Sequence, residues 1–424
     1  MSHPAHAPLL QDLRETMFRP GGMSGGGPPL IGAELEVLPV FADSGRRVPT
    51  LGPAGSFMAV LRPLASRLGW RERVSAKGTP VFDIPGGSHL TFEPGGQLEL
   101  SLAPHRSVSG LLRDLEHLYA GLERASAEHG IELLAVGIDP ENAIEDVALQ
   151  FDCERYRRMT AYFDSIGPAG VRMMRQTATL HVNLDMDDGV PERWRLLNAI
   201  APVLLAMFAN SPRYEGATTG YRSYRGETWR TLDWSRTGLA DRGGDPVTDY
   251  LQFALDARVI LLDPVVGEYQ SFGDRWDAGL LTLDDWHAHL TTLFPEVRPR
   301  GYLEVRAIDA LSVPLAAAPI TLLAGIAYDR TSLNQALEVL GPARTALLHV
   351  AGEQGLADAR LARMAQELAD IGLAGCHRLG PSVVHGADLE RATDFFQRYT
   401  RRRRCPADDH LRPADAAVAS GAGR

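Results

Sequence analysis

The sequence is poor in lysine, because Lys77 is its only one and every other strongly basic residue is arginine. The segment around it, VSAKGTP, lacks the Gly-x4-Gly-Lys-Ser/Thr pattern of a phosphate-binding P-loop. A P-loop is therefore excluded, and a protein of this sequence that used a nucleotide would hold the phosphates in another way. The formal net charge of −10 also argues against a general nucleic-acid binder, which needs a broad basic surface.

Cysteine and long apolar runs are scarce as well. Cys153, Cys376 and Cys405 form no Cys-x-x-Cys pair, so neither a zinc knuckle nor a disulfide framework is indicated, and we expect a reducing cytoplasm. The longest strongly apolar run, residues 196–209, is shorter than the ~20 residues that span a bilayer. The N-terminus has no basic start followed by an apolar core, so we expect no signal peptide and no membrane partner.

The remaining composition is that of an ordinary globular chain with one large ordered body. Residues 1–29 end in GGMSGGGPP and are expected to be a flexible N-terminal segment. Residues 30–404 are expected to form a single catalytic domain, and residues 405–424, rich in Pro, Ala and Gly, a disordered tail. Periodicity predicts helices over residues 56–68, 107–129, 191–209, 246–257, 313–340 and 343–371. Strands separated by long helical stretches, with no regular βαβ cadence, favour an α+β fold with a mostly antiparallel sheet.

Four segments, residues 31–37, 92–104, 179–187 and 302–309, alternate apolar and polar residues as half-buried strands do. Their polar positions carry a recurring set of acidic residues and one histidine: Glu34, Glu36, Glu93, Glu99, His181 and Glu304. One such face alone would be interpreted as solvated surface. Four together predict a sheet whose apolar face is covered by helices and whose other face is a cup lined by these side chains.

A cup of this composition predicts a metal site. Gathered carboxylates repel one another unless cations neutralise them. Oxygen ligands with one imidazole suit Mg²⁺ or Mn²⁺, the ions that usually accompany ATP phosphates, whereas no cysteine set or His-Glu-x-x-His motif indicates zinc. We therefore expect the six residues to form one divalent-metal cluster.

Arginine supplies the cationic chemistry of the sequence. Arg175 precedes the histidine strand, and residues 209–238 form a loop-like stretch dense in arginine, glycine and aromatic residues. A guanidinium group pairs bidentately with a carboxylate or a phosphate, so this stretch suits an amino-acid substrate and a nucleotide equally. Each arginine taken alone is more often a surface salt-bridge partner.

Several sequence motifs occur here in the same order along the chain as in one known protein family. They are GAELE, FEPGGQLELS, RYRRMTAYFDSIGPAGVRMMRQTATLHVNLD, MFANSP, EGATTGYRSYRGETW, SRTG and YLEVRAID, and they span roughly residues 30–310. In this the sequence resembles the glutamate–cysteine ligase family of the plant and proteobacterial type.

The resemblance implies both a fold and a reaction. The fold would be a cup-shaped, mostly antiparallel sheet wrapped by helices, similar to the catalytic half of glutamine synthetases. The reaction would be the ATP- and Mg²⁺-dependent joining of the L-glutamate γ-carboxylate to the L-cysteine amine through γ-glutamyl phosphate, which gives γ-glutamylcysteine.

The resemblance also implies roles for individual residues. The five glutamates of the cup resemble the family's metal ligands, and His181 matches bacterial relatives with a histidine ligand. Arg225 resembles the arginine that holds glutamate, and Arg175 is the second arginine that the motifs place at the mouth of the cup.

The remaining site assignments are to neighbours on the same strand faces. Arg306, beside Glu304, is our candidate for stabilising the transferred phosphoryl group, and Glu304 is placed with it in catalysis. Gln97 and Asn183 are assigned to substrate binding.

Two alternatives stay open at this point. A related ligase with another amine acceptor would have the same metal cup, and a non-catalytic regulatory homologue would be expected to lose one of its carboxylates, yet none is missing. The expected partners are glutamate, cysteine and ATP. The sequence leaves open whether the product serves glutathione or ergothioneine synthesis, and whether the chain is a monomer or a homodimer.

Overall fold

The computed structural model describes residues 4–19, 29–52, 55–75, 78–186, 189–261 and 270–411. Within these ranges nine strands form the main sheet, in the order β12-β13-β7-β1-β5-β4-β3-β2, with β6 paired to the end of β1. All neighbouring pairs in this sheet are antiparallel. The strands are β1 Ile31–Phe41, β2 Arg71–Val74, β3 Pro80–Asp83, β4 His89–Phe92, β5 Leu98–Ser101, β6 Ile131–Leu134, β7 Leu180–Asp185, β12 Val297–Pro299 and β13 Tyr302–Val305. The expected α+β fold with a mostly antiparallel sheet is confirmed.

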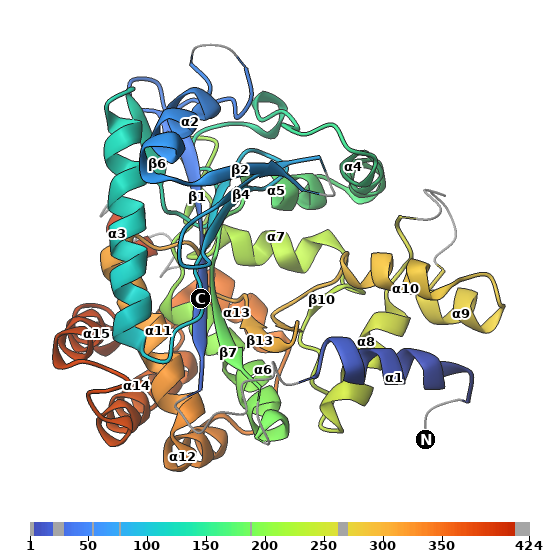
Figure 1. Ribbon diagram of the computed structural model, residues 1–424. Coiled ribbons are helices and arrows are strands. Elements are labelled where there is room, and N and C mark those ends of the chain that lie inside the picture. The colour runs from blue at the N-terminus through green and yellow to red at the C-terminus, as the bar shows by residue number, and fades with distance from the viewer. Residues whose placement is uncertain are drawn as a thin grey trace.

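Helices surround this sheet, as Figure 1 shows, with α3, α11, α14 and α15 on one side of β1 and α1, α8, α9 and α10 gathered on the other. The helices are α1 Ala7–Thr16, α2 Phe57–Leu68, α3 Val108–Ala127, α4 Glu154–Ile166, α5 Ala169–Gln176, α6 Val190–Met207, α7 Tyr224–Leu232, α8 Pro246–Asp256, α9 Phe272–Asp277, α10 Leu283–Leu290, α11 Val313–Tyr328, α12 Arg330–Leu340, α13 Ala346–Gln354, α14 Ala359–Leu379, α15 Gly386–Arg398 and α16 Ala407–His410. Short 3₁₀ turns and strands complete the set: η1 Pro4–His6, η2 Ile144–Asp146, η3 Gly355–Ala357, η4 Thr400–Arg402, β8 Arg213–Tyr214, β9 Ala217–Thr218, β10 Thr237–Gly238 and β11 Phe294–Pro295. Of the helices described, none is both long and apolar enough to cross a membrane.

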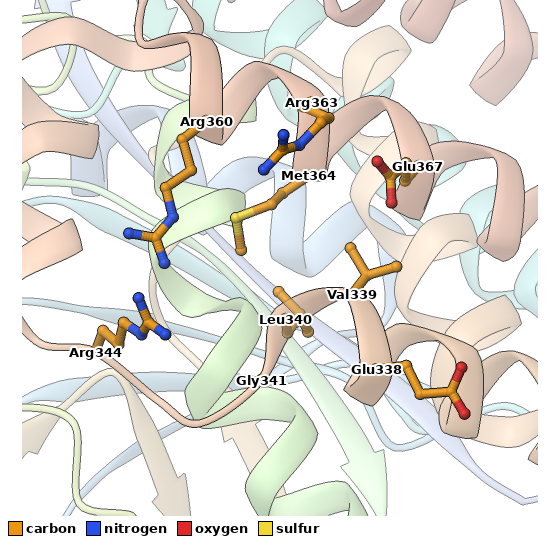
Figure 2. A pocket seen from close by; sticks show the side chains of 9 residues that line it. All are labelled: Glu338, Val339, Leu340, Gly341, Arg344, Arg360, Arg363, Met364 and Glu367. Atoms are coloured by element: carbon orange, nitrogen blue, oxygen red, sulfur yellow. The ribbon is translucent and has the colours of Figure 1, made fainter.

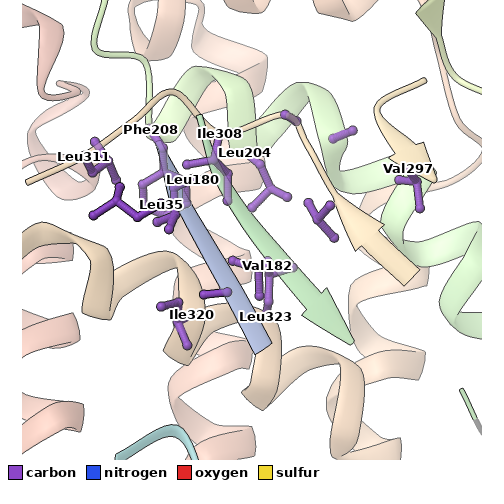
Figure 3. Close-up of a cluster of buried hydrophobic side chains, with 14 of the residues drawn as sticks. Leu35, Leu180, Val182, Leu204, Phe208, Val297, Ile308, Leu311, Ile320 and Leu323 are labelled. Atoms are coloured by element: carbon purple, nitrogen blue, oxygen red, sulfur yellow. The ribbon is translucent and has the colours of Figure 1, made fainter. Parts of the chain in front are cut away.

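The apolar face of the sheet is buried against α6 and α11. Figure 3 shows Leu35 of β1 and Val182 of β7 in one cluster with Leu204 of α6 and Ile320 of α11. Each of these side chains is at most 1% exposed, and burial of such a side chain stabilises the fold by about 1.5–3 kcal/mol. This packing fixes which face of each strand points away from the core, and therefore where the polar residues gather.

Two long predicted helices are each divided in the structure. The segment 313–340 breaks at Asp329, whose carboxylate accepts a hydrogen bond from the Ser332 backbone N–H at 2.7 Å and so caps a new helix, α12. The segment 343–371 breaks at Gly355, whose φ of +56° favours glycine, and Asp358 then caps α14. Apolar periodicity continues across both breaks, because the successive helices pack on the same core, so periodicity alone did not reveal them.

The N-terminal segment is partly ordered, contrary to the expectation of flexibility through residue 29. Helix α1 buries Leu9 and Leu13 completely, a spacing that places both on one helical face. The Asp12 carboxylate accepts a hydrogen bond from Trp286 Nε1 at 3.0 Å and lies 2.9 Å from His287 Nε2. Residues 20–28 of the predicted segment lie outside the described residues.

Residues 405–411, which belong to the predicted disordered tail, are ordered. Cys405 and Ala407 are fully buried, and the Ala407 backbone N–H donates to the Ala209 carbonyl at 2.9 Å. Asp408 accepts from Arg222 at 2.7 Å, which attaches the chain to the body after residue 404. Residues 412–424, like Lys77, lie outside the described residues.

The contact between α1 and α10 predicts a measurable contribution of Asp12 to stability. Asp12→Ala leaves the indole N–H of the buried Trp286 without its acceptor, which should destabilise the fold by about 1–3 kcal/mol. In a chain of this length the loss corresponds to a melting temperature lower by roughly 1–5 °C in scanning calorimetry. Glu15→Ala, at an exposed position on the same helix, is the matched control and should not change the melting temperature. Equal melting of both variants would contradict this role.

Candidate active site

The register of the sheet brings the predicted polar residues together. In the pairing of β1 with its two neighbours, Glu34 lies opposite His181 on β7 and Glu36 lies opposite Glu99 on β5. Glu304 on β13 lies opposite Asn183, one strand further along. Because side chains on directly opposed residues share a face, these residues meet on the face away from the α6 and α11 core.

A cavity of about 1220 Å³ lies over this face. Its lining includes five of the six predicted ligands: Glu34, Glu36, Glu93, Glu99 and His181. Glu304 is fully buried and is not part of the lining. The predicted cup is therefore present, with one of its members beneath the surface.

The six residues form two groups of three instead of the single cluster that we expected. One group is Glu34, His181 and Glu304, and the other is Glu36, Glu93 and Glu99; within each, one ligand atom per residue lies within 4.8 Å of the others. The reason is the sheet register, which spreads the residues along and across several strands. The two groups still interact electrostatically. Burial is the main cause that raises the pKa of Glu99 in the second group, and the charge of Glu34 in the first group raises it further.

The first group is balanced by hydrogen bonds. His181 Nδ1 lies 3.3 Å from Glu34 Oε2, and Asn183 Nδ2 donates to Glu34 Oε1 at 3.0 Å. Burial alone would raise the pKa of Glu34, but the hydrogen bond with His181 helps to bring it below its usual value. Glu34 is therefore held as a carboxylate.

Glu304 is surrounded by arginine. Arg298 donates to both of its oxygens, at 2.7 and 3.1 Å, and Arg306 donates to Oε2 at 2.7 Å. Arg300 adds a weaker contact at 3.4 Å. Burial opposes ionisation, but the guanidinium charges hold the pKa of Glu304 well below its usual range.

The hairpin β12–β13 supplies these arginines, and sequence reasoning missed two of them. Arg298 lies directly opposite Glu304 in the hairpin register, and Gly301, with φ +76°, makes the turn. The signal was present in VRPRGYLEVR, where a glycine between two alternating runs indicates a hairpin. Applied there, it would have placed Arg298 beside Glu304.

The carboxyl groups of the second group form hydrogen bonds but no ion pair with the described residues. Thr179 donates its backbone N–H to Glu36 at 2.8 Å, and Thr91 donates its hydroxyl to Glu99 at 2.7 Å. Within the described part of the chain, no arginine, histidine or lysine nitrogen forms an ion pair within 4.0 Å of Glu36, Glu93 or Glu99.

Burial raises the pKa of Glu36, although the charges of His181 and Arg306 oppose it. Burial, reinforced by the neighbouring carboxylates, raises the pKa of Glu99 well above its usual range. Three clustered carboxyl groups are a donor set that a hard divalent cation fits. The second group is therefore the better candidate metal centre.

Arg225 and Arg175 lie away from the position that we expected. Arg225 is 1% exposed and does not line the cavity; it pairs with Asp309 at 3.4 Å and donates to the Arg306 carbonyl. The predicted loop around it contains a helix, α7, which Ser223 caps by accepting from the Gly226 N–H at 2.9 Å. Arg175 is also absent from the lining and points to the Val147 carbonyl at 3.5 Å.

The two amide side chains predicted to bind substrate, Gln97 and Asn183, differ in whether their polar atoms already form hydrogen bonds. Gln97 donates to the Thr177 carbonyl at 2.9 Å and accepts from the Gly95 N–H at 3.0 Å, so backbone groups occupy its amide. It ties the turn before β5 to the end of α5, where a Cβ on Gly95 would lie 2.1 Å from the Arg175 carbonyl oxygen. Asn183 lines the cavity, and its buried Oδ1 makes no hydrogen bond with any described residue.

Several cavity residues were not predicted at all, among them Arg155, Tyr156 and Trp229. Trp229, on α7, is 4% exposed, and the Arg225 guanidinium lies 4.6 Å from its ring centroid. Arg155 donates to the Thr291 carbonyl at 2.8 Å. Their segments were recognised, but these residues lie on the helices α4 and α7, and the sequence did not reveal how those helices face the sheet.

Comparison with known proteins agrees with this geometry. The model of glutamate–cysteine ligase family 2 matches residues 30–412. The glutamate–cysteine ligase EgtA of Mycolicibacterium smegmatis is 35% identical over 84% of this chain and 84% of its own length. The chloroplastic glutamate–cysteine ligase B of rice, Oryza sativa subsp. japonica, is 32% identical over 65% of this chain and 58% of its own.

A solved structure shares the fold. The glutamate–cysteine ligase of Francisella tularensis, solved in complex with AMP, has a TM-score of 0.54 and 14% identity, and the likeness covers 95% of this chain and 88% of that one. Helix α1, whose Thr16 lies in the wall of the cavity, falls outside the family match. The match of the family model over most of the sequence shows that the chain belongs to glutamate–cysteine ligase family 2 and is a ligase.

Proposed function

We propose that the protein joins the γ-carboxylate of L-glutamate to the amine of L-cysteine, with ATP and Mg²⁺ or Mn²⁺, through γ-glutamyl phosphate. The observation that carries the proposal is the pairing of opposite charges over one cavity. Glu36, Glu93 and Glu99 offer a cation site, and the arginines of β12–β13 offer anion sites on the same cavity. A reaction between a nucleotide triphosphate and a carboxylate needs both.

The metal proposal rests on the donor set. Glu36, Glu93 and Glu99 would hold one divalent cation, and Glu34 with His181 and Glu304 could hold another. The first group is the stronger candidate, since Glu304 is already paired with three guanidinium groups. A bound divalent cation would neutralise phosphate charge during phosphoryl transfer.

The arginines would bind the anionic parts of the substrates. Arg306 lines the cavity, and its buried Nε makes no hydrogen bond with a described residue, so it has a donor left for a phosphoryl oxygen. Arg300 has a side chain that is 47% exposed and only one weak contact, which leaves its planar fork free to grip the α-carboxylate of glutamate. This role replaces the one that we expected for Arg225.

Other groups would orient the substrates and exclude water. The free Oδ1 of Asn183 could accept a hydrogen bond from a substrate ammonium group. The aromatic side chains of Tyr156, Phe294 and Trp229 give the cavity apolar walls. Such walls favour attack by the neutral cysteine amine and protect an acyl phosphate from hydrolysis.

The two alternatives are weighed by the same observations. A ligase for another amine acceptor would use the same carboxylates and arginines, so only a substrate panel separates it from this proposal. A non-catalytic homologue is disfavoured, because a cluster of buried carboxylates destabilises a fold that does not use it.

We also propose a cytoplasmic location. The three cysteines are free thiols, and a reducing compartment such as the cytoplasm usually keeps thiols in that state. Relatives named EgtA and relatives from chloroplasts are both similar to this chain, so the product could enter ergothioneine or glutathione synthesis. Monomer and homodimer are both compatible with the proposal.

The reaction predicts specific products. With glutamate, cysteine, ATP and Mg²⁺ together, the protein should release ADP and phosphate, and a panel of amino acids in place of cysteine should give less. Hydroxylamine added in place of cysteine should trap the acyl phosphate as a glutamyl hydroxamate, measured by its colour with ferric ion. Release of AMP and pyrophosphate would show adenylation and would refute the phosphoryl intermediate.

The metal site predicts opposite effects of Glu99→Gln on stability and on binding. Without metal, the variant should melt at or above the wild-type temperature, because an amide cannot ionise beside the carboxylates that, together with burial, raise the pKa of Glu99. Its affinity for Mn²⁺, measured by calorimetry, should fall by roughly tenfold or more, and ligation should fall with it. Glu132→Gln, exposed on β6, is the control and should change neither quantity. Unchanged Mn²⁺ affinity in Glu99→Gln would place the metal elsewhere.

The arginine assignment predicts different kinetics for two variants. Arg300→Lys should raise the KM for glutamate by roughly tenfold, with a smaller change for ATP and no change in melting temperature. Arg225→Lys should raise both Michaelis constants and lower the melting temperature, since Arg225 supports the backbone of Arg306 from the core. A selective glutamate defect in a normally stable Arg225→Lys protein would restore the original assignment.

A further inference from the structure

A second pocket, of about 500 Å³, lies between the C-terminal end of α12 and the first half of α14 (Figure 2). Its apolar side is formed by Leu340 and Met364, each 5% exposed. Its other walls carry three arginines, Arg344, Arg360 and Arg363. None of its residues lines the large cavity, so the pocket is separate from the candidate active site.

None of the acidic side chains that the structure describes pairs with the three arginines. Within the described residues, no carboxylate oxygen lies within 4.0 Å of Arg344, Arg360 or Arg363. The chain has 53 acidic against 43 basic residues, and other arginines on its surface are paired, as Arg62 is with Glu72 at 2.9 Å. Three unpaired arginines around one pocket are therefore not explained by a shortage of acidic residues.

The arrangement of the side chains concentrates positive charge in part of the pocket. Figure 2 shows Arg344 and Arg360 pointing toward each other, while Glu338 and Glu367 lie on the opposite side. Arg360 also lies in the first turn of α14, a helix of 21 residues whose N-terminus adds partial positive charge. Guanidinium groups that face one another repel, and an anion placed between them removes the repulsion.

We propose that this pocket binds a small organic phosphate. A planar guanidinium group matches the oxygens of a phosphate, and two of them can hold one phosphate from two sides. The volume exceeds what a single phosphate fills, and Leu340 and Met364 offer contact for the uncharged part of the molecule. The proposal does not depend on the ligation reaction, because its residues lie outside the large cavity.

Arginine labelling of the wild-type protein tests the proposal directly. Phenylglyoxal modification, followed residue by residue with mass spectrometry, is run with and without pyrophosphate in metal-free buffer. We expect pyrophosphate to slow the modification of Arg344 and Arg360 at least about threefold. Arg113 and Arg124 are exposed on α3 and form no ion pair with a described residue, so they should react at unchanged rates. Equal rates at Arg344 and Arg360 with and without pyrophosphate would overturn the proposal.

Paired variants test it by a second route. Arg344→Gln with Arg360→Gln removes the same charge as Arg113→Gln with Arg124→Gln. In calorimetric titration, the first pair should lose one pyrophosphate site or bind pyrophosphate there about tenfold or more weakly. The second pair should match wild type. Identical titrations for both pairs would overturn the proposal. The labelling experiment is repeated with citrate to test whether the pocket prefers a carboxylate ligand. If citrate protects Arg344 and Arg360 better than pyrophosphate does, the assignment to phosphate is wrong.

Discussion

Repulsion among buried carboxylates is the constraint on which the rest of this structure depends. Glu36 and Glu99 face each other across two central strands, and Glu34 lies two residues along β1 on the same face. No fold would gather these groups unless something compensates their charge. At Glu304 the compensation is internal, from Arg298 and Arg306. At Glu36, Glu93 and Glu99 no described residue forms an ion pair, and a divalent cation is the compensation that this donor set suits.

The surrounding structure holds this charge arrangement in place. Helices α6 and α11 bury the apolar face of the central strands, which leaves the carboxylates no other side to occupy. Behind β13, fully buried Asp309 accepts from Ser211 at 2.7 Å and pairs with Arg225, whose guanidinium supports the Arg306 carbonyl. The arginine that faces the cavity is thus positioned by an arginine that does not. Such a supporting layer keeps the charged groups aligned when no substrate is bound.

Sequence reasoning found what depends on local periodicity and missed what depends on register. The alternation in TLHVNLD was sufficient to assign His181 and Asn183 to a polar face, because side chains on a strand alternate strictly. It could not say which residue on another strand would lie opposite, so one expected cluster became two groups. Arg225 stands in a matching motif, yet it is buried on α7, a helix capped by Ser223 that sequence alone left as a loop. Asp329 likewise divides a helix whose apolar pattern continues on both sides.

Anomalous diffraction from crystals soaked in MnCl₂, recorded at the manganese edge, tests the central claim most directly. The account predicts an anomalous peak bound by the carboxylates of Glu36, Glu93 and Glu99, because these three clustered groups form no ion pair with a described residue. Any weaker peak should lie at Glu34 and His181. A cavity without a manganese peak, in crystals that show manganese bound elsewhere on the protein, would contradict the account.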